Sequence, residues 1–215
     1  MAISTYSELS TAVQNWLDDT SLSARVPEFI ALAEERINGD FGSIRKAWTT
    51  TTLTGTSSSR ALTLPTGYIE PRALYLTTDG QQTYLNPFVN GTMPLRTSSS
   101  TPLGWCINGD NINLDCLLAQ ADTFLFHYRA KWDIASTLTN WLLTNHPGAY
   151  LSASLVEAYV YRDNDNGALK WETRYQQASE RINQEESRNT AVAPLRVDQA
   201  LLPAPNGGWF NYTIG

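Results

Sequence analysis

The side chains best suited to chemistry in this sequence are two histidines and two cysteines, and their spacing matches no common site. His127 and His146 are the only histidines, and Cys106 and Cys116 are the only cysteines. A zinc site would need close Cys pairs or His partners at short spacing, and the sequence has neither. Two ordinary buried or half-buried thiols are expected, because free cysteine is among the most buried residue types. A disulfide is sterically possible, but a reducing compartment disfavours it.

The surroundings of the histidines weaken the case for catalysis. Residues alternate between apolar and polar in the segment 122–130, and this places His127 opposite an aromatic row. A solvated or locally hydrogen-bonded histidine is therefore expected there. His146 precedes Pro147 and Gly148, which favour the first turn of a helix. It is either part of an active site or a residue at the entry to that helix.

Carboxylates give two further candidates. Asp163, Asp165 and Gly167 are spaced like part of a calcium loop, but Arg174 stands where a bidentate glutamate belongs. A turn between two helices is the better interpretation. Glu157 lies on an apolar helix face, where a buried carboxylate paired with an arginine is expected. Two acids that only the fold brings together leave no local signature, so a carboxylate-based glycosidase stays open as an alternative.

Composition indicates a folded chain and argues against wrapping of nucleic acid. Of 215 residues, 42% are apolar and 17% are charged, which is enough to build a core. The net charge of −6 offers no basic face for phosphate groups. No apolar run approaches the length of a membrane span, and no signal peptide is expected at the start of the sequence. Folding in the cytosol is therefore expected.

Helical spacing of apolar residues dominates both ends of the sequence. The stripes in the segments 7–19 and 24–41 predict two helices, and Asn38-Gly39 predicts a left-handed stop to the second. Two more helices are expected after Pro147, joined by a turn at the segment 162–167. We expect the stripes to bury the following residues together: Ile30, Ala33, Leu151, Leu155, Tyr175 and Ile182.

The middle of the sequence has a different period. From Ala47 to Arg129, short alternating or β-branched runs are separated by turns such as Asp79-Gly80, which predicts strands and hairpins. The segment Asn86–Pro102 is expected to be a long exposed loop, of a length that is often functional or mobile. Together with the flanking helices, these strands predict an α+β fold.

The last segment, 191–215, has three prolines and no helical period, and it is rich in aromatic residues near its end. It is either disordered or an extended docking arm. Its aromatic content favours the arm, because solvated linkers contain few aromatics. The predicted partner-binding residues are Trp209, Phe210, Tyr212 and Ile214.

The order of these pieces resembles the phage head-to-tail adaptor proteins, the tail connector family that lies below the portal. The resemblance covers residues 6–183 and leaves the arm outside it. The long, Ser/Thr-rich loop also departs from the family pattern. The stretches that carry the resemblance are TYSELSTAVQNWL, RVPEFIALAEERINGDF, LTLPTGYIEPRALYL, INGDNINL before FLFHYRAKW, and TNWLLTNHPGAYLSASLVEAYVYRDN before WETRYQQASERIN.

The resemblance implies an architecture and answers the question about His146. It implies an antiparallel α-helical bundle formed by the N- and C-terminal helices (1–46 and 130–190). An inserted antiparallel β domain (47–129) and an extended C-terminal arm (191–215) complete the expected domain organisation. His146 and Pro147 then form a structural helix entry. No catalytic residue, cofactor or metal ligand is expected.

The implied function is structural. The family pattern implies a dodecameric ring that docks on the portal protein, extends the DNA channel and carries the tail at the head–tail neck of the virion. The next partners would be tail nozzle, hub or fibre proteins. Double-stranded DNA would pass through without sequence-specific binding, and no membrane would be involved. The alternative is a virion module that binds or hydrolyses carbohydrate or cell wall.

Overall fold

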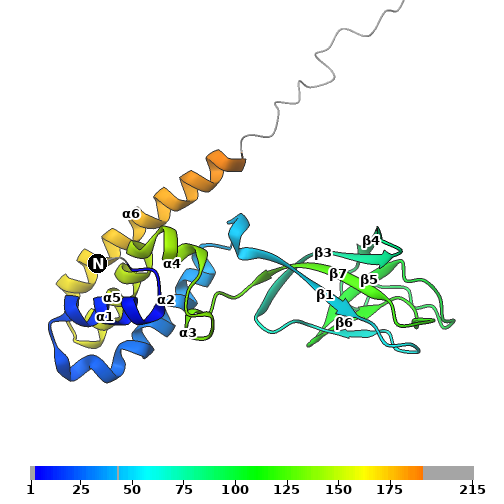
Figure 1. Ribbon diagram of the computed structural model, residues 1–215, viewed down its shortest axis with the longest axis horizontal. Coiled ribbons are helices and arrows are strands. Elements are labelled where there is room, and N and C mark those ends of the chain that lie inside the picture. Colours follow the sequence, from blue (N-terminus) through cyan, green and yellow to red (C-terminus); the bar gives the residue numbers. More distant parts are fainter. Residues whose placement is uncertain (1–2, 43, 191–215) are drawn as a thin grey trace, which may run out of the picture.

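A computed structural model describes residues 3–42 and 44–190 of the chain. Helices gather at one end of the molecule and a curled sheet forms the other end (Figure 1). The helical elements are α1 (Tyr6–Leu17), η1 (Thr20–Arg25), α2 (Val26–Asp40), η2 (Arg45–Ala47), α3 (Ile134–Thr137), α4 (Trp141–Asn145), α5 (Pro147–Tyr161) and α6 (Asp165–Thr190). The strands are β1 (Trp48–Thr54), β2 (Ala61–Thr63), β3 (Tyr68–Thr78), β4 (Gln81–Pro87), β5 (Gly104–Asn108), β6 (Asn111–Leu114) and β7 (Thr123–Ala130).

Local side-chain chemistry sets the helix starts. Thr5 accepts a hydrogen bond from the backbone of Glu8, and the Glu8 side chain binds back to the N-cap, forming a capping box for α1. Asn140 caps α4 by accepting from the backbone of Leu143. The predicted stop of α2 at Asn38-Gly39 is wrong, because α2 continues to Asp40. The Asn38 side chain donates to the Glu34 carbonyl within α2 and also bonds to the backbone of Trp132, which links α2 to the segment after β7.

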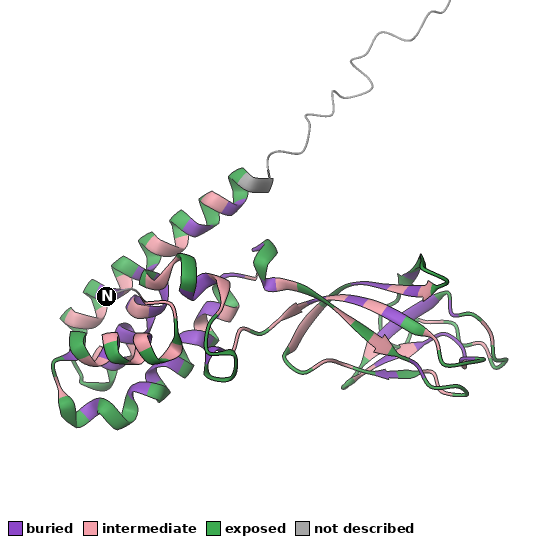
Figure 2. Cartoon of the chain, viewed as in Figure 1, coloured by how far each residue is buried: buried purple, intermediate pink, exposed green. Residues whose placement is uncertain are grey.

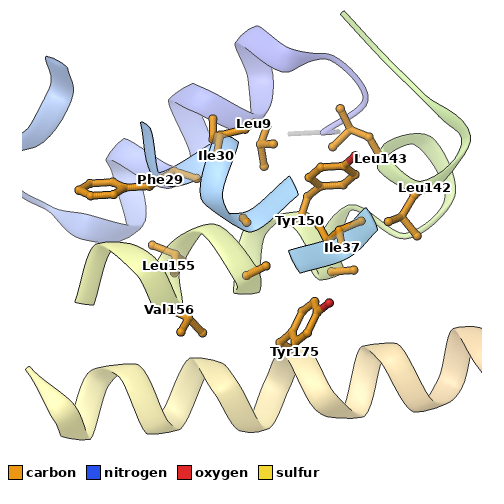
Figure 3. Close-up of a cluster of buried hydrophobic side chains, with 14 of the residues drawn as sticks. Leu9, Phe29, Ile30, Ile37, Leu142, Leu143, Tyr150, Leu155, Val156 and Tyr175 are labelled. Atoms are coloured by element: carbon orange, nitrogen blue, oxygen red, sulfur yellow. The ribbon is translucent and has the colours of Figure 1, made fainter. Parts of the chain in front are cut away.

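The helices share one apolar core, with α5 at its centre (Figure 3). Helix α5 contacts α1, α2, α4 and α6. Five of the six residues predicted to be buried together belong to this core, and Leu151 is half-buried against it. That part of the prediction is confirmed. The five buried residues are Ile30, Ala33, Leu155, Tyr175 and Ile182.

The strands form one seven-stranded mixed sheet in the order β1-β7-β3-β4-β5-β6-β2. Its neighbours pair antiparallel except for β4 and β5, which run parallel. The sheet encloses a second apolar core that includes Phe124, Phe126 and Trp105. Figure 2 shows the buried positions of the sheet and of the helices.

The predicted architecture is therefore wrong, although the α+β class agrees with the structure. The fold is centred on the curled mixed sheet, and the six α-helices of the described residues do not form an antiparallel bundle that carries an inserted antiparallel domain. Apolar stripes determine which helix faces are buried, but they do not determine the angles at which helices cross. The connection 88–103 returns the chain so that β5 pairs parallel to β4, which hairpin patterns cannot predict.

A small polar junction links the two ends of the molecule. The carboxamide of Asn38 donates to the Trp132 carbonyl at 3.0 Å and accepts from the Trp132 amide at 2.8 Å. The Arg129 guanidinium donates to the Asn38 carbonyl at 3.1 Å and pairs with Glu70 at 3.3 Å. Gly42 leaves room for this guanidinium, since a Cβ there would lie 2.0 Å from Arg129 Nη1. The chain is thus held where it leaves and re-enters the helices.

Candidate interaction surfaces

The structure places His127 on β7 with partners that suit a structural role. Its Nδ1 lies 3.1 Å from the hydroxyl of Thr50 on β1. Its ring packs edge-on against Tyr75 of β3, with centroids 5.4 Å apart. Within the described ranges, no three His, Cys, Asp or Glu side chains gather closely enough to hold a metal ion. His127 therefore has local hydrogen-bonding and ring contacts but no ligand set.

His146 lies directly before Pro147, where α5 begins. Its ring packs edge-on against Trp141 of α4, with centroids 5.3 Å apart. Its Nε2 lies 3.5 Å from the carboxylate of Glu185 on α6. The Arg181 guanidinium binds the same carboxylate and holds the pKa of Glu185 below its usual value. His146 lowers the pKa of Glu185 in the same direction, but by less. His146 thus connects the α4–α5 corner to α6.

The acid that the fold buries most completely in the helical core is Glu34, not Glu157. Glu34 is 6% exposed, whereas Glu157 is only half-buried. Glu34 Oε1 accepts from the backbone amide of Ile134 at 3.0 Å and from the Tyr150 hydroxyl at 2.9 Å. Burial raises the pKa of Glu34, and these two hydrogen bonds oppose that shift. The carboxylate joins α2 to the start of α3 and to α5.

Both cysteines are buried, free thiols. Burial raises the pKa of Cys106 and that of Cys116, so neither is activated as a nucleophile. Cys116 Sγ donates to the carbonyl of Ser100 at 3.1 Å. The prediction of two ordinary buried thiols is confirmed.

The calcium-like segment is a turn. Helix α5 ends at Tyr161 and α6 begins at Asp165. Asp163 adopts the left-handed conformation with φ 55°, and the Asn164 side chain accepts from the amide of Gly167 at 3.0 Å. The segment ends α5 and leads into α6, so the predicted helix-terminating turn is confirmed.

The connection 88–103 is exposed along most of its length but is anchored by backbone hydrogen bonds and by an ion pair between half-buried Arg96 and buried Asp115. Asp115 is 5% exposed, and its carboxylate lies 2.7 Å from Arg96 Nη2. The same carboxylate accepts from the amide of Leu103 at 3.0 Å, and Arg96 also donates to the Thr101 carbonyl at 2.8 Å. The sequence gives no local sign of this pair. The Arg96–Asp115 ion pair helps to order a connection that carries exposed apolar side chains.

Large exposed apolar side chains lie on both ends of the molecule. We call them the helical set and the sheet set. Single exposed apolar side chains are normal on a protein surface, and an assembly subunit can use such side chains as contacts. The helical set consists of Trp16, Leu32, Val160, Tyr161 and Leu169; the sheet set consists of Tyr84, Phe88, Val89, Leu95 and Leu103.

The rings of the helical set are supported by neighbours in the core. Trp16 packs edge-on against buried Trp171, with centroids 5.2 Å apart, and Tyr161 packs against Phe29 at 5.5 Å. Arg174 lies over the Trp171 ring at 4.5 Å. These contacts hold exposed rings in one orientation, which lowers the entropy that a partner would have to remove on binding.

An aromatic row on the outer sheet face bears on the carbohydrate alternative. Tyr84 of β4 is exposed and packs edge-on against half-buried Tyr75 of β3, with centroids 5.6 Å apart. Tyr75 in turn packs edge-on against His127. These three rings therefore meet edge to face and do not form a flat platform of several fully exposed aromatics. The four predicted partner-binding residues of the arm, Trp209, Phe210, Tyr212 and Ile214, lie outside the described residues.

Comparison with known proteins points to one family. The family model described as SU10 adaptor protein matches residues 4–198. A search of curated proteins finds no match to the chain. None of the helices in the described part combines the length and the apolar character that a membrane span requires.

Proposed function

Because the chain belongs to the SU10 adaptor protein family, we propose that it forms a dodecameric ring at the head–tail neck of the virion. It is a phage adaptor, and its family is structural, with head and tail components as partners. In the proposed assembly, one side of the ring docks on the portal protein. The other side carries a tail nozzle, hub or fibre protein.

The exposure of large apolar side chains on both ends of one subunit is the observation that best supports this proposal. An adaptor needs separate surfaces for different partners, and a closed ring needs two different surfaces for its neighbours. The helical set and the sheet set meet the first requirement. Leu169 is 67% exposed on α6 and Trp16 is 53% exposed on α1, so each has apolar area to bury in a contact.

The charge of the chain suits a channel that DNA traverses. The net charge is −6, and a surface of like charge to the phosphates resists binding them. In the proposed ring, DNA therefore slides past without sequence-specific contact. Assembly takes place in the host cytoplasm, and no catalytic step, cofactor or metal enters the proposal.

Electron microscopy of the purified protein, alone and with portal-containing heads, tests the ring. We expect closed rings with a central channel, seated on the portal. Leu169→Asp should reduce ring formation, because it places a charge in an apolar contact. Gln177→Asp is the matched control, since it adds the same charge at another exposed position of α6. Dispersed single subunits under both conditions would overturn the proposal.

A further inference from the structure

Within residues 3–42 and 44–190, strand β1 has a paired neighbour on one side only and so leaves one edge of the sheet open. It pairs with β7 along its full length, from Trp48↔Arg129 to Thr54↔Thr123, and it stands at the end of the strand order. Alternate amides of an antiparallel edge strand point away from its partner. Proteins usually protect such an edge with charged residues, proline or a bulge. β1 has the sequence WTTTTLT, which offers none of these.

The open edge also borders apolar surface that is only partly covered. Leu53 of β1 and Leu64, just after β2, are half-buried against the sheet core. Strand β2, at the other edge of the curled sheet, contacts β1 but pairs with β6, and it has only three residues, fewer than the seven of β1. An additional strand beside β1 would satisfy its free backbone groups and bury Leu53 more fully.

A segment near the end of the sequence has the pattern that such a strand requires. In Trp209–Ile214, the apolar residues Phe210, Tyr212 and Ile214 alternate with Asn211 and Thr213. Aromatic and β-branched residues with a period of two are typical of a half-buried strand. The segment lies outside the described residues. Its pattern matches β1, in which half-buried Thr51 and Leu53 alternate with exposed threonines.

The end of α6 lies next to the start of β1. Near the end of that helix, Glu186 accepts a hydrogen bond from the backbone amide of Arg45 at 3.2 Å, and β1 begins three residues later at Trp48. The connecting segment 191–208 can span about 60 Å when extended, whereas a strand of the length of β1 spans about 23 Å. The same chain can therefore reach its own edge, and the covalent link raises the effective concentration there.

We propose that Trp209–Ile214 pairs with the free edge of β1 in the same, unassembled subunit. Phe210, Tyr212 and Ile214 then face Leu53 and the partly covered core, while Asn211 and Thr213 face solvent. This pairing protects the edge from other copies of the chain until assembly. It does not depend on the ring or on the portal, and in an assembled neck the segment would exchange this edge for its partner.

Hydrogen exchange of the full-length protein at low concentration tests the pairing. We expect the outward-pointing amides of Thr49–Thr54 to exchange about tenfold or more slowly in the full chain than after deletion of Asn206–Gly215. Tyr212→Pro should give the same loss of protection, because proline removes a backbone donor and disrupts pairing. Asn206→Pro is the matched control outside the strand segment and should keep the protection. Amides of β3 should be unchanged throughout, which shows that the sheet stays folded.

Two results would overturn the proposal. One is equal exchange of the β1 amides with and without Asn206–Gly215. The other is protection that appears only as the protein concentration rises, since that would assign the segment to a second copy. Neither result depends on whether rings form or bind the portal, so failure here is distinguishable from failure of the proposed function.

Discussion

Arg36 on α2 and Glu172 on α6 form a two-pronged ion pair, with Nη1 2.6 Å from Oε2 and Nη2 2.5 Å from Oε1. The Arg36 guanidinium also lies over the Tyr175 ring at 4.3 Å, and the Tyr175 hydroxyl donates to Asp40 at 2.6 Å. Arg36 holds the pKa of Glu172 below its usual value. This group of side chains fixes α6 against α2 at the border of the helical core.

Arg36→Ala is expected to lower the free energy of unfolding by about 1–3 kcal/mol, measured by chemical denaturation. This loss lies between those typical of exposed and of buried ion pairs, because the Arg36 and Glu172 side chains are both partly covered. Arg25→Ala is the matched control, since the Arg25–Glu28 side chains are 51% and 58% exposed, and a loss under about 0.5 kcal/mol is expected. Equal losses in the two variants would contradict the role given to the Arg36–Glu172 pair.

Glu34 should make stability depend on pH in a specific direction. Burial raises its pKa in the folded state, so its stabilising contribution is present below the unfolded pKa and is lost as pH rises through the folded value. Glu34→Gln keeps an oxygen that can accept from Ile134 and Tyr150 but cannot ionise. We expect this variant to gain stability relative to the native chain as pH rises above the ordinary glutamate pKa of about 4.3.

Denaturation of both proteins at several pH values measures this difference. Glu34→Ala is the companion variant, and it should lose about 2–3 kcal/mol because two buried donors are left without an acceptor. A stability difference between the glutamine variant and the native chain that stays constant with pH would contradict ionisation of Glu34 as the cause.

Leu155→Ala tests the centre of the helical core. Leu155 is fully buried on α5, and its truncation should cost about 2–5 kcal/mol through lost burial and the cavity left behind. Val160→Ala is a control on the same helix, because Val160 is 59% exposed. A loss under about 0.5 kcal/mol for Leu155→Ala would show that this face of α5 is not core.

Much of the core was predictable because apolar spacing reports which face of an element is buried. The stripes through Ile30 and Ile182 identify the buried helix faces, and alternation in β7 identifies Phe124 and Phe126 as inward-facing. The pattern carries no information on how helices cross or on whether a long connection returns a strand parallel or antiparallel. The apolar pattern therefore could not predict the mixed sheet or the arrangement of helices around α5.

The buried polar groups were missed for a related reason. Glu34 meets Tyr150 across 116 residues of sequence, and Arg96 meets Asp115 across 19. Neither pair has a local motif, because only the folded chain brings the partners together. The surfaces were predictable only in kind: high aromatic content indicates contacts, but the position of Trp16 and Leu169 at the surface depends on what their neighbours cover.

The histidines provide a test of the non-enzymatic interpretation. His127→Gln and His146→Gln are each expected to leave virion assembly and infectivity intact. His127 contacts the Thr50 hydroxyl and the Tyr75 ring, and His146 contacts the Trp141 ring and the Glu185 carboxylate, contacts that suit structural roles. Particle yield and plaque counts measure the outcome. Normal particles that have lost infectivity in either variant would reopen an enzymatic function.

Deletion of Asn206–Gly215 tests the arm as an anchor in the assembled neck. The deletion leaves both apolar cores intact, so the subunit should still fold, as judged by circular dichroism. Its retention on portal-containing heads should fall, because Trp209, Phe210 and Tyr212 supply large apolar area with few rotatable bonds. Prolines at 194, 203 and 205 stiffen the approach and reduce the entropy lost on docking.

Sedimentation of heads with bound adaptor measures the retention. Asn206→Pro, which keeps all the aromatic anchors, is the control and should bind as the native chain does. If the truncated protein sediments with the heads as completely as the native chain, the arm is not the anchor and the contact must be made by the helical set or the sheet set.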